Sequence, residues 1–178
     1  DNMNLGLVEV NQDDEILMIN QCFSDMSGYS ENELIGKKAK EVFLSKPDRH
    51  FLTEQNKKRI NGVSGSYELK VKNKLGKEKD WLISGAPNLN LNGDYLGSIG
   101  IHLDITESNR NIELIQEQKS ELDVIINNAP VGIVLTQVDK IVKTNATFEK
   151  MLGYSEYEFM NLRIKNILVP EDFKEVKN

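Results

Sequence analysis

Two short apolar runs separated by a polar cluster open the chain. Residues 5–10 and 16–19 are mostly apolar, and the segment between them holds Asn11, Asp13 and Asp14. Asn and Asp favour turns because their side chains hydrogen-bond nearby backbone groups and tolerate left-handed conformations. The pattern therefore predicts a β-hairpin.

Residues 20–36 carry the start and stop signals of two short helices. Asn20 occupies a typical N-cap position, and Gly28 stands where glycine often ends a helix. Ser30 and Glu33 have the spacing of a capping box for the second helix, which is expected to end at Gly36.

The period of the apolar residues changes at Gly62, from a helical repeat to strand alternation. Residues 48–61 predict a helix with one face marked by Phe51, Leu52, Gln55 and Ile60. After Gly62, strands are predicted near 67–71, 81–83 and 95–103, with Asn92-Gly93 as a hairpin turn. Two strands, several short helices and three further strands predict an α+β fold.

Residues 105–127 predict one long helix, since they contain neither Gly nor Pro. Alternating spacings of three and four residues mark a heptad seam on it, made of Ile112, Ile115, Lys119, Leu122 and Ile126. Lys119 interrupts this seam with a charge. Only about three heptads are present, so the helix is marginal as an isolated coiled coil.

An internal repeat shows that the chain contains two copies of one module. The segment Asn20–Glu31 recurs as Asn145–Glu156 at an offset of 125 residues, with Asn, Phe, Met, Gly, Tyr, Ser and Glu in register. The first two strands recur at 131–135 and 141–142. No counterpart of the last three strands follows, so residues 128–178 are expected to form about half of a second module.

The charge balance excludes several classes of partner. A net charge of −6 argues against nucleic acid or an anionic membrane surface, because both attract basic patches. The apolar runs are too short to span a bilayer, for which about 20 residues are needed. The single Cys22 fits a reducing compartment, so a cytoplasmic location is expected. Since the chain begins at Asp1, we expect flanking segments, and the parent protein could be anchored in a membrane through them.

Catalytic motifs are missing from the sequence. It contains no glycine-rich phosphate loop, no Gly-x-Ser-x-Gly, no His-Glu-x-x-His and no metal-ligand spacing. We therefore expect no enzymatic activity and no metal site in this chain.

Three motifs in series resemble the PAS (Per-ARNT-Sim) family with its PAC portion. They lie in residues 20–36, in Lys74-x-Gly76-x-x-x-x-Trp81, and in residues 97–107, which close with Asp104-Ile-Thr-Glu. The resemblance implies a five-stranded antiparallel sheet that cradles short helices around a small pocket. It also implies a complete domain at 1–107, a linker helix at 108–127 and a truncated second domain at 128–178.

The resemblance implies a sensory or interaction role. The expected function is the sensory region of a bacterial sensor histidine kinase whose catalytic part lies outside this chain. Pocket occupancy would change a parallel homodimer formed through the helix seam. The alternatives are a ligand-free dimerisation scaffold, or the sensor part of a cyclic-dinucleotide enzyme, a chemoreceptor or a transcription regulator. A pocket lined by His102 would favour sensing, and a pocket closed by apolar side chains would favour the scaffold.

His102 is the first candidate ligand-binding residue. Strand alternation places it on one face with Gly100 and Asp104, while Ile99 and Ile101 lie on the other. In flavin-binding relatives a pocket-facing Gln occupies the corresponding position. His102 could therefore hydrogen-bond a small ligand and titrate near neutral pH, or serve only as a structural residue of the sheet.

Two further residues raise the question of a cofactor. His50 lies near the position of the iron-ligating His of haem-binding relatives, but the polar sequence Asp48-Arg49-His50 favours a solvated or capping role. Cys22 lacks the Asn-Cys-Arg-Phe context of the light-sensing flavin variant and is interpreted as a small buried residue. The cofactor is therefore unknown, and the sequence argues against flavin and haem.

The remaining site prediction is a signalling elbow at Asp104 and Thr106. In the family that Asp commonly pairs with a basic residue, whose identity the sequence leaves open. The aromatic residues are interpreted as core rather than cofactor contacts: Phe23, Phe43, Phe51, Tyr67 and Trp81.

Overall fold

The structure is a computed structural model that describes residues 5–163 and residue 167. It divides into two units, Asp1–Asn111 and Ile112–Asn178, and each is described by itself. The boundary lies four residues after the end of the first predicted domain. Part of the predicted second domain, residues 164–166 and 168–178, lies outside the described residues.

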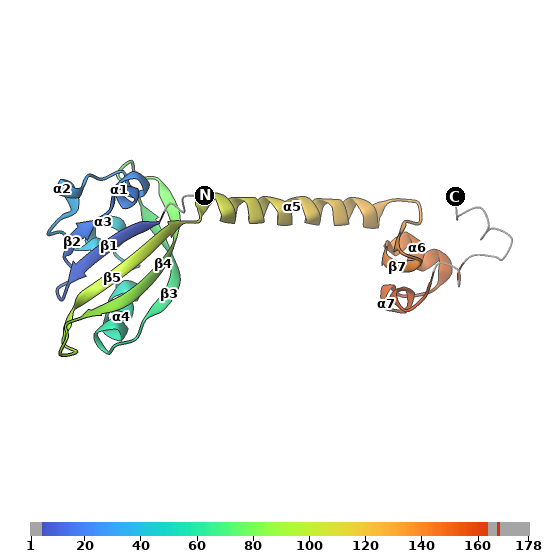
Figure 1. Cartoon of the computed structure of the whole chain (residues 1–178). Helices are drawn as coiled ribbons and strands as arrows, with labels where there is room; N and C mark the ends of the chain where they lie inside the picture. The colour runs from blue at the N-terminus through green and yellow to red at the C-terminus, as the bar shows by residue number, and fades with distance from the viewer. Residues whose placement is uncertain (1–4, 164–166, 168–178) are drawn as a thin grey trace. The chain divides into compact units, whose positions relative to one another are not determined.

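One antiparallel sheet of five strands forms the frame of the first unit (Figure 1). The strands are β1 (Gly6–Asn11), β2 (Ile16–Ile19), β3 (Gly65–Lys72), β4 (Glu78–Leu89) and β5 (Tyr95–Asp104). Their order in the sheet is β2-β1-β5-β4-β3, so the first strand pairs with the last. The predicted α+β architecture with a five-stranded antiparallel sheet is confirmed.

Four short helices lie between the second and third strands in sequence and cover one face of the sheet (Figure 1). They are α1 (Gln21–Ser27), α2 (Glu31–Leu34), α3 (Ala39–Phe43) and α4 (Arg49–Ile60). The predicted N-cap is confirmed, since Asn20 Oδ1 accepts the Phe23 amide at 2.9 Å. Gly28 ends α1 with a φ of 76°, a left-handed conformation that glycine adopts without strain. The capping box also forms, because the Ser30 amide donates to Glu33 at 2.9 Å.

The core lies between this sheet and the helices. Phe23, Phe43 and Trp81 are buried there, as predicted, and Tyr67 is partly buried against them. The rings of Phe23 and Phe43 meet edge to face, with centroids 5.6 Å apart. Phe51 was wrongly predicted as core: it is 41% exposed, and its ring packs on Tyr67.

The buried face of α4 differs from the predicted one. Leu52 and Arg59 are buried, whereas Ile60 is 54% exposed. Leu52, Asn56 and Arg59 follow one another at spacings of four and three residues, so they share a helix face. Of the predicted face only Leu52 is buried, and an arginine rather than Ile60 completes the inner face.

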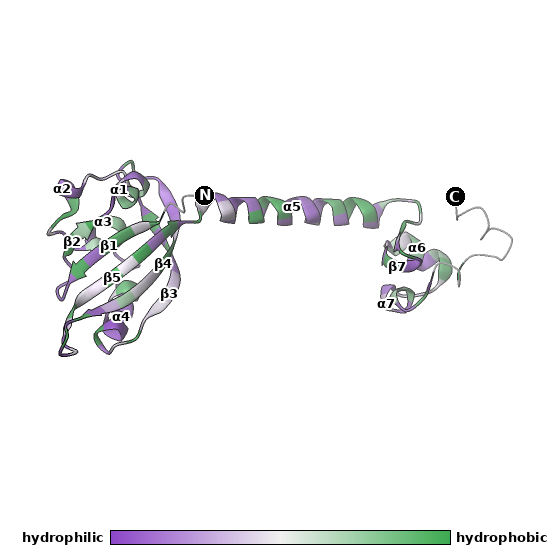
Figure 2. Ribbon diagram, in the orientation of Figure 1, coloured by the Kyte–Doolittle hydropathy of each residue, from purple (hydrophilic) through white to green (hydrophobic). Residues whose placement is uncertain are grey.

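Helix α5 (Thr106–Asn128) follows the sheet directly and contains no buried residue. Ile112, Ile115 and Leu122 of the predicted seam are between 51% and 64% exposed, and Ile126 is half-buried. Figure 2 shows hydrophobic residues distributed along this helix. In the part of the chain that the structure describes, no helix has the length and apolar character needed to cross a membrane.

The second unit repeats the first elements of the module. It contains β6 (Val134–Gln137), β7 (Lys140–Thr144), α6 (Ala146–Leu152) and α7 (Glu156–Met160). Asn145 caps α6 as Asn20 caps α1. The first strand begins later than predicted, because the Ile133 amide donates to Asn145 Oδ1 at 2.8 Å rather than to a neighbouring strand.

Candidate functional site

A cavity of about 70 Å³ lies between the sheet and the helices of the first unit. Most of its walls are apolar, contributed by residues such as Val8, Phe23, Leu52 and Ile83. Polar side chains also line it, namely Asp14, Arg59, Tyr67, Ser98 and His102. An apolar cavity with a few polar groups is the usual form of a small-molecule site.

Four buried polar atoms at this cavity have no hydrogen-bond partner among the described residues. They are Asp14 Oδ2, Arg59 Nε, Trp81 Nε1 and His102 Nδ1. All four residues line the cavity. Buried polar groups are normally paired, so such a concentration calls for an explanation by a bound molecule or ordered water.

His102 lies on the inner face of β5, with its ring against Phe23 and Trp81 at centroid distances of 5.0 and 5.6 Å. Ile101, its neighbour in sequence, is exposed on the opposite face. Burial, and secondly the charge of Arg59, lower the pKa of His102 to about 3. The expectation that His102 titrates near neutral pH is therefore wrong, and the imidazole is neutral under physiological conditions.

Arg59 extends from the last turn of α4 into the cavity and is only 7% exposed. Its Nη1 donates to the Tyr67 hydroxyl at 3.3 Å, and its Nη2 donates to Asn56 Oδ1. Among the described residues, no carboxylate lies within 4.0 Å of the guanidinium. The direct hydrogen-bond partners of the guanidinium are thus neutral groups, while the Asp14 carboxyl acts on its charge from a longer distance.

Asp14 approaches the cavity from the turn between β1 and β2, where its φ is 67°. Burial raises its pKa, although a hydrogen bond from Asn56 and the charges of Lys40, Arg59 and Lys38 act in the opposite direction. Asn56 therefore interacts with both the Asp14 carboxyl and the Arg59 guanidinium.

Two glycines make room for these polar side chains. Gly85 of β4 and Gly100 of β5 are direct partners in the sheet. A Cβ at Gly85 would overlap Arg59 Nη1, and a Cβ at Gly100 would come within 2.9 Å of His102 Nε2. Arg59 and His102 thus lie against two paired glycine positions of β4 and β5, where the sheet has no side chains on this face.

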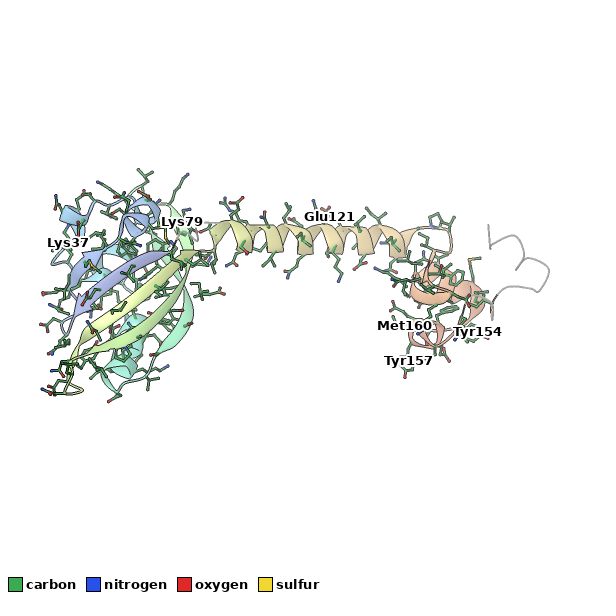
Figure 3. The ribbon with its side chains drawn as sticks, in the orientation of Figure 1. Lys37, Lys79, Glu121, Tyr154, Tyr157 and Met160 are labelled. Carbon is green, nitrogen blue, oxygen red and sulfur yellow. The ribbon has the colours of Figure 1, made fainter. Side chains whose placement is uncertain are left out.

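The elbow between β5 and α5 is a compact hydrogen-bonded corner. The Lys79 ammonium lies 2.8 Å from Asp104 Oδ2, so Lys79 is the basic partner that the sequence left open. Asp104 Oδ1 accepts the Thr106 amide at 3.0 Å, and Thr106 Oγ1 accepts the Asp80 amide at 2.9 Å. Figure 3 labels Lys79 where the sheet meets α5.

The electrostatics of this corner favour the charged carboxylate. Partial burial of Asp104 acts to raise its pKa, but hydrogen bonds from Lys79 and Thr106 outweigh that effect and lower the pKa. The ionised Asp104 side chain therefore links β4, the end of β5 and the first turn of α5.

The other candidate residues lie outside the cavity. His50 is exposed on the first turn of α4, and Cys22 is half-buried on α1; neither lines the cavity. No group of three His, Cys, Asp or Glu side chains suited to a metal ion occurs in the described part of the chain.

Sequence reasoning found His102 but missed Arg59, Asn56 and Asp14. Asn56 and Arg59 could have been found from their helical register with Leu52, which places all three on one face of α4. Asp14 gave no signal, because Asp in a hairpin turn is ordinary.

Comparisons with known proteins agree with this architecture. A family model described as a PAS domain matches residues 4–107, and a second PAS domain model matches residues 120–177. Among curated proteins no significant match is found.

Solved structures of the same fold share little sequence with this chain. The PAS domain of a protein from Colwellia psychrerythraea is 21% identical, with a TM-score of 0.54 over 60% of this chain and 91% of that chain. A light-oxygen-voltage domain studied with a flavin analogue is 18% identical, with a TM-score of 0.53 over 65% of this chain and 87% of that one. An RNA-binding light-oxygen-voltage receptor is 18% identical, with a TM-score of 0.58, and the match covers 67% of this chain and only 35% of the receptor.

The first match alone spans more than half of the chain, and the second covers the repeated segment. The chain therefore belongs to the PAS domain family and carries two PAS domains in tandem, which gives it a sensory or signalling role.

Proposed function

We propose that the first PAS domain detects a small molecule in its internal cavity and transmits the occupancy of that cavity to α5. The observation that carries this proposal is the set of four unpartnered buried polar atoms, all on residues that line one cavity. A scaffold that fills its own pocket would gain nothing from such groups, because each costs about 1–3 kcal/mol when it is left unpaired.

The route of transmission follows strand β5. His102 lines the cavity, and Asp104 lies two residues further along the same strand, at the start of the elbow. Asp104 bonds Lys79 on the neighbouring strand and the first turn of α5 at Thr106. A shift of β5 against β4 would therefore change the geometry of the corner from which α5 begins.

The seam of α5 supports dimerisation as the output. Ile112, Ile115 and Leu122 are exposed at heptad spacing, and a parallel partner helix would bury them. On this proposal the parent protein is a cytoplasmic signalling protein, with a sensor histidine kinase as the first candidate for its output. A cyclic-dinucleotide enzyme, a chemoreceptor or a transcription regulator would use the same sensor.

The sensing function is tested by native mass spectrometry of the freshly purified chain, followed by NMR titration with a library of small molecules. We expect either a retained mass or amide shifts at Gly85, Gly100 and His102 on addition of a ligand. A chain that carries no added mass and shows no shift at these residues with any compound would support the scaffold instead.

Disulfide trapping tests the dimer. Single cysteines at Ile115 and Leu122 should crosslink readily in a Cys22→Ser background, and cysteines at Glu117 and Glu121, off the seam, should not. Equal crosslinking at all four positions would contradict a parallel seam.

A further inference from the structure

We infer that the cavity of the first PAS domain selects a small carboxylate that carries a hydroxyl group, with Arg59 as the partner of the carboxylate. This inference rests on the sensing function proposed above and names the chemical class of its ligand. The two can fail separately, because a neutral ligand in the same cavity would leave the sensing function intact.

The charge of Arg59 is the first argument. Arg59 is only 7% exposed, and its guanidinium donates hydrogen bonds only to the neutral oxygens of Tyr67 and Asn56. A buried charge is costly unless an opposite charge pairs with it and hydrogen bonds satisfy it. The Asp14 carboxyl acts on Arg59 only from a distance, and no carboxylate of the described residues lies within 4.0 Å, so an anion from outside would supply the direct pairing.

The type of unpartnered atom is the second argument. Arg59 Nε and Trp81 Nε1 are donors, and neutral His102 has one nitrogen that can donate. Asp14 Oδ2 is an acceptor. Such a set matches a ligand with acceptor oxygens and at least one donor, which describes a hydroxy acid better than a simple acid.

Asp14 also limits the charge of the ligand. The positive charges of Lys40, Arg59 and Lys38 act on the Asp14 carboxyl and favour its ionised form. Arg59 is therefore not the only charged group at the cavity. A dianion such as phosphate would meet one buried cation and an acidic side chain. A monoanion pairs with Arg59 without that excess of negative charge.

The volume limits the size of the ligand. An engineered cavity of about 150 Å³ holds benzene, which has six non-hydrogen atoms. The cavity here measures about 70 Å³. In proportion it has room for about three non-hydrogen atoms, so lactate, which has six, fits only if the cavity widens when it binds.

The test is an NMR and calorimetric titration of the whole chain with four probes of similar size: lactate, propionate, propionamide and phosphate. We expect lactate to bind more tightly than propionate, and propionamide and phosphate to bind at least tenfold more weakly than lactate. Bound lactate should also raise the pKa of His102, seen in the shifts of its ring carbons, because the anion offsets the charge of Arg59.

Variants on one helix assign the effect to Arg59. Arg59→Met should weaken lactate binding at least tenfold, whereas Lys58→Met, at an exposed position on α4, should leave it unchanged. If Arg59→Met fails to fold, Arg59→Gln keeps a polar group near Tyr67 and should show the same loss.

Three outcomes would overturn the inference. Propionamide could bind as tightly as propionate, lactate binding could survive in the Arg59 variants, or no carboxylate could bind the wild-type chain. If a neutral molecule binds in any of these cases, the sensing function stands without this ligand class. If nothing binds and ordered water alone fills the cavity, both fail.

Discussion

The Arg59 guanidinium lies directly against the backbone of Gly85 on β4. A Cβ at position 85 would overlap Arg59 Nη1 and come within 3.1 Å of its Cζ. The absence of a side chain on β4 at this point is what allows a buried guanidinium to lie over the sheet.

Gly85→Ala is therefore expected to destabilise the first domain. Overpacking of a buried site typically costs about 1–3 kcal/mol, and here it also displaces Arg59 from Tyr67. Urea denaturation measures the loss. Gly65→Ala is the matched control, since Gly65 pairs with Gly85 in the sheet but has open space where its Cβ would lie. Equal losses in both variants would contradict the steric argument.

Asn20→Ala is expected to lower the free energy of unfolding by about 1–3 kcal/mol. Asn20 Oδ1 accepts the amides of Leu7 and Phe23, and its Nδ2 donates to the Leu5 carbonyl, each at 2.9 Å. Thermal or urea denaturation measures the change. Asn32→Ala, at an exposed position of α2, should have almost no effect. A loss below about 0.5 kcal/mol at Asn20 would mean that water replaces these bonds without cost.

The bonds of Asp104 to Lys79 and to Thr106 can be separated at the elbow. Lys79→Met removes the ion pair, which is partly exposed and should contribute no more than about 1 kcal/mol. Asp104→Ala also removes the acceptor of the Thr106 amide, so hydrogen exchange in the first turn of α5 should accelerate in this variant only. Similar acceleration in both variants would show that the ion pair, rather than the cap, fixes the start of the helix.

Stability should fall in mild acid because of His102. Its pKa is about 3 in the folded state and about 6.5 in an unfolded chain, so between these values the unfolded state binds more protons. The stabilisation is complete above about pH 6.5 and declines as the pH falls, by at most about 1.4 kcal/mol per pH unit. Urea denaturation at a series of pH values should show this slope in the wild type and a shallower one in His102→Gln. Parallel slopes would mean that His102 is accessible to protons in the folded state.

The sequence predicted those parts of the fold that depend on local signals. The caps at Asn20 and Gly28, the capping box at Ser30 and the two-residue alternation of β5 each act within a few residues, and all were found. The repeat transferred the same reasoning to Asn145.

The parts that were missed depend on contacts between distant segments. Whether Arg59 faces the core depends on the room left by Gly85 and on the Tyr67 hydroxyl, which belong to other elements. The pKa of His102 depends on its burial under Phe23 and Trp81. Lys79 could be identified as the partner of Asp104 only once β4 and β5 were in register, with Trp81 opposite Asp104.

The central claim is that the cavity and the elbow are coupled, and hydrogen exchange at the elbow tests it most directly. The amides of Asp80, Ile105 and Thr106 report on the elbow, since all three donate within it. In Arg59→Met, a change made only in the cavity, these amides should change their exchange rates at least about fivefold more than amides of the β1–β5 ladder, and Lys58→Met should leave them unchanged. Exchange at the elbow that changes no more than in the ladder would contradict the account, because the cavity would then have no connection to α5.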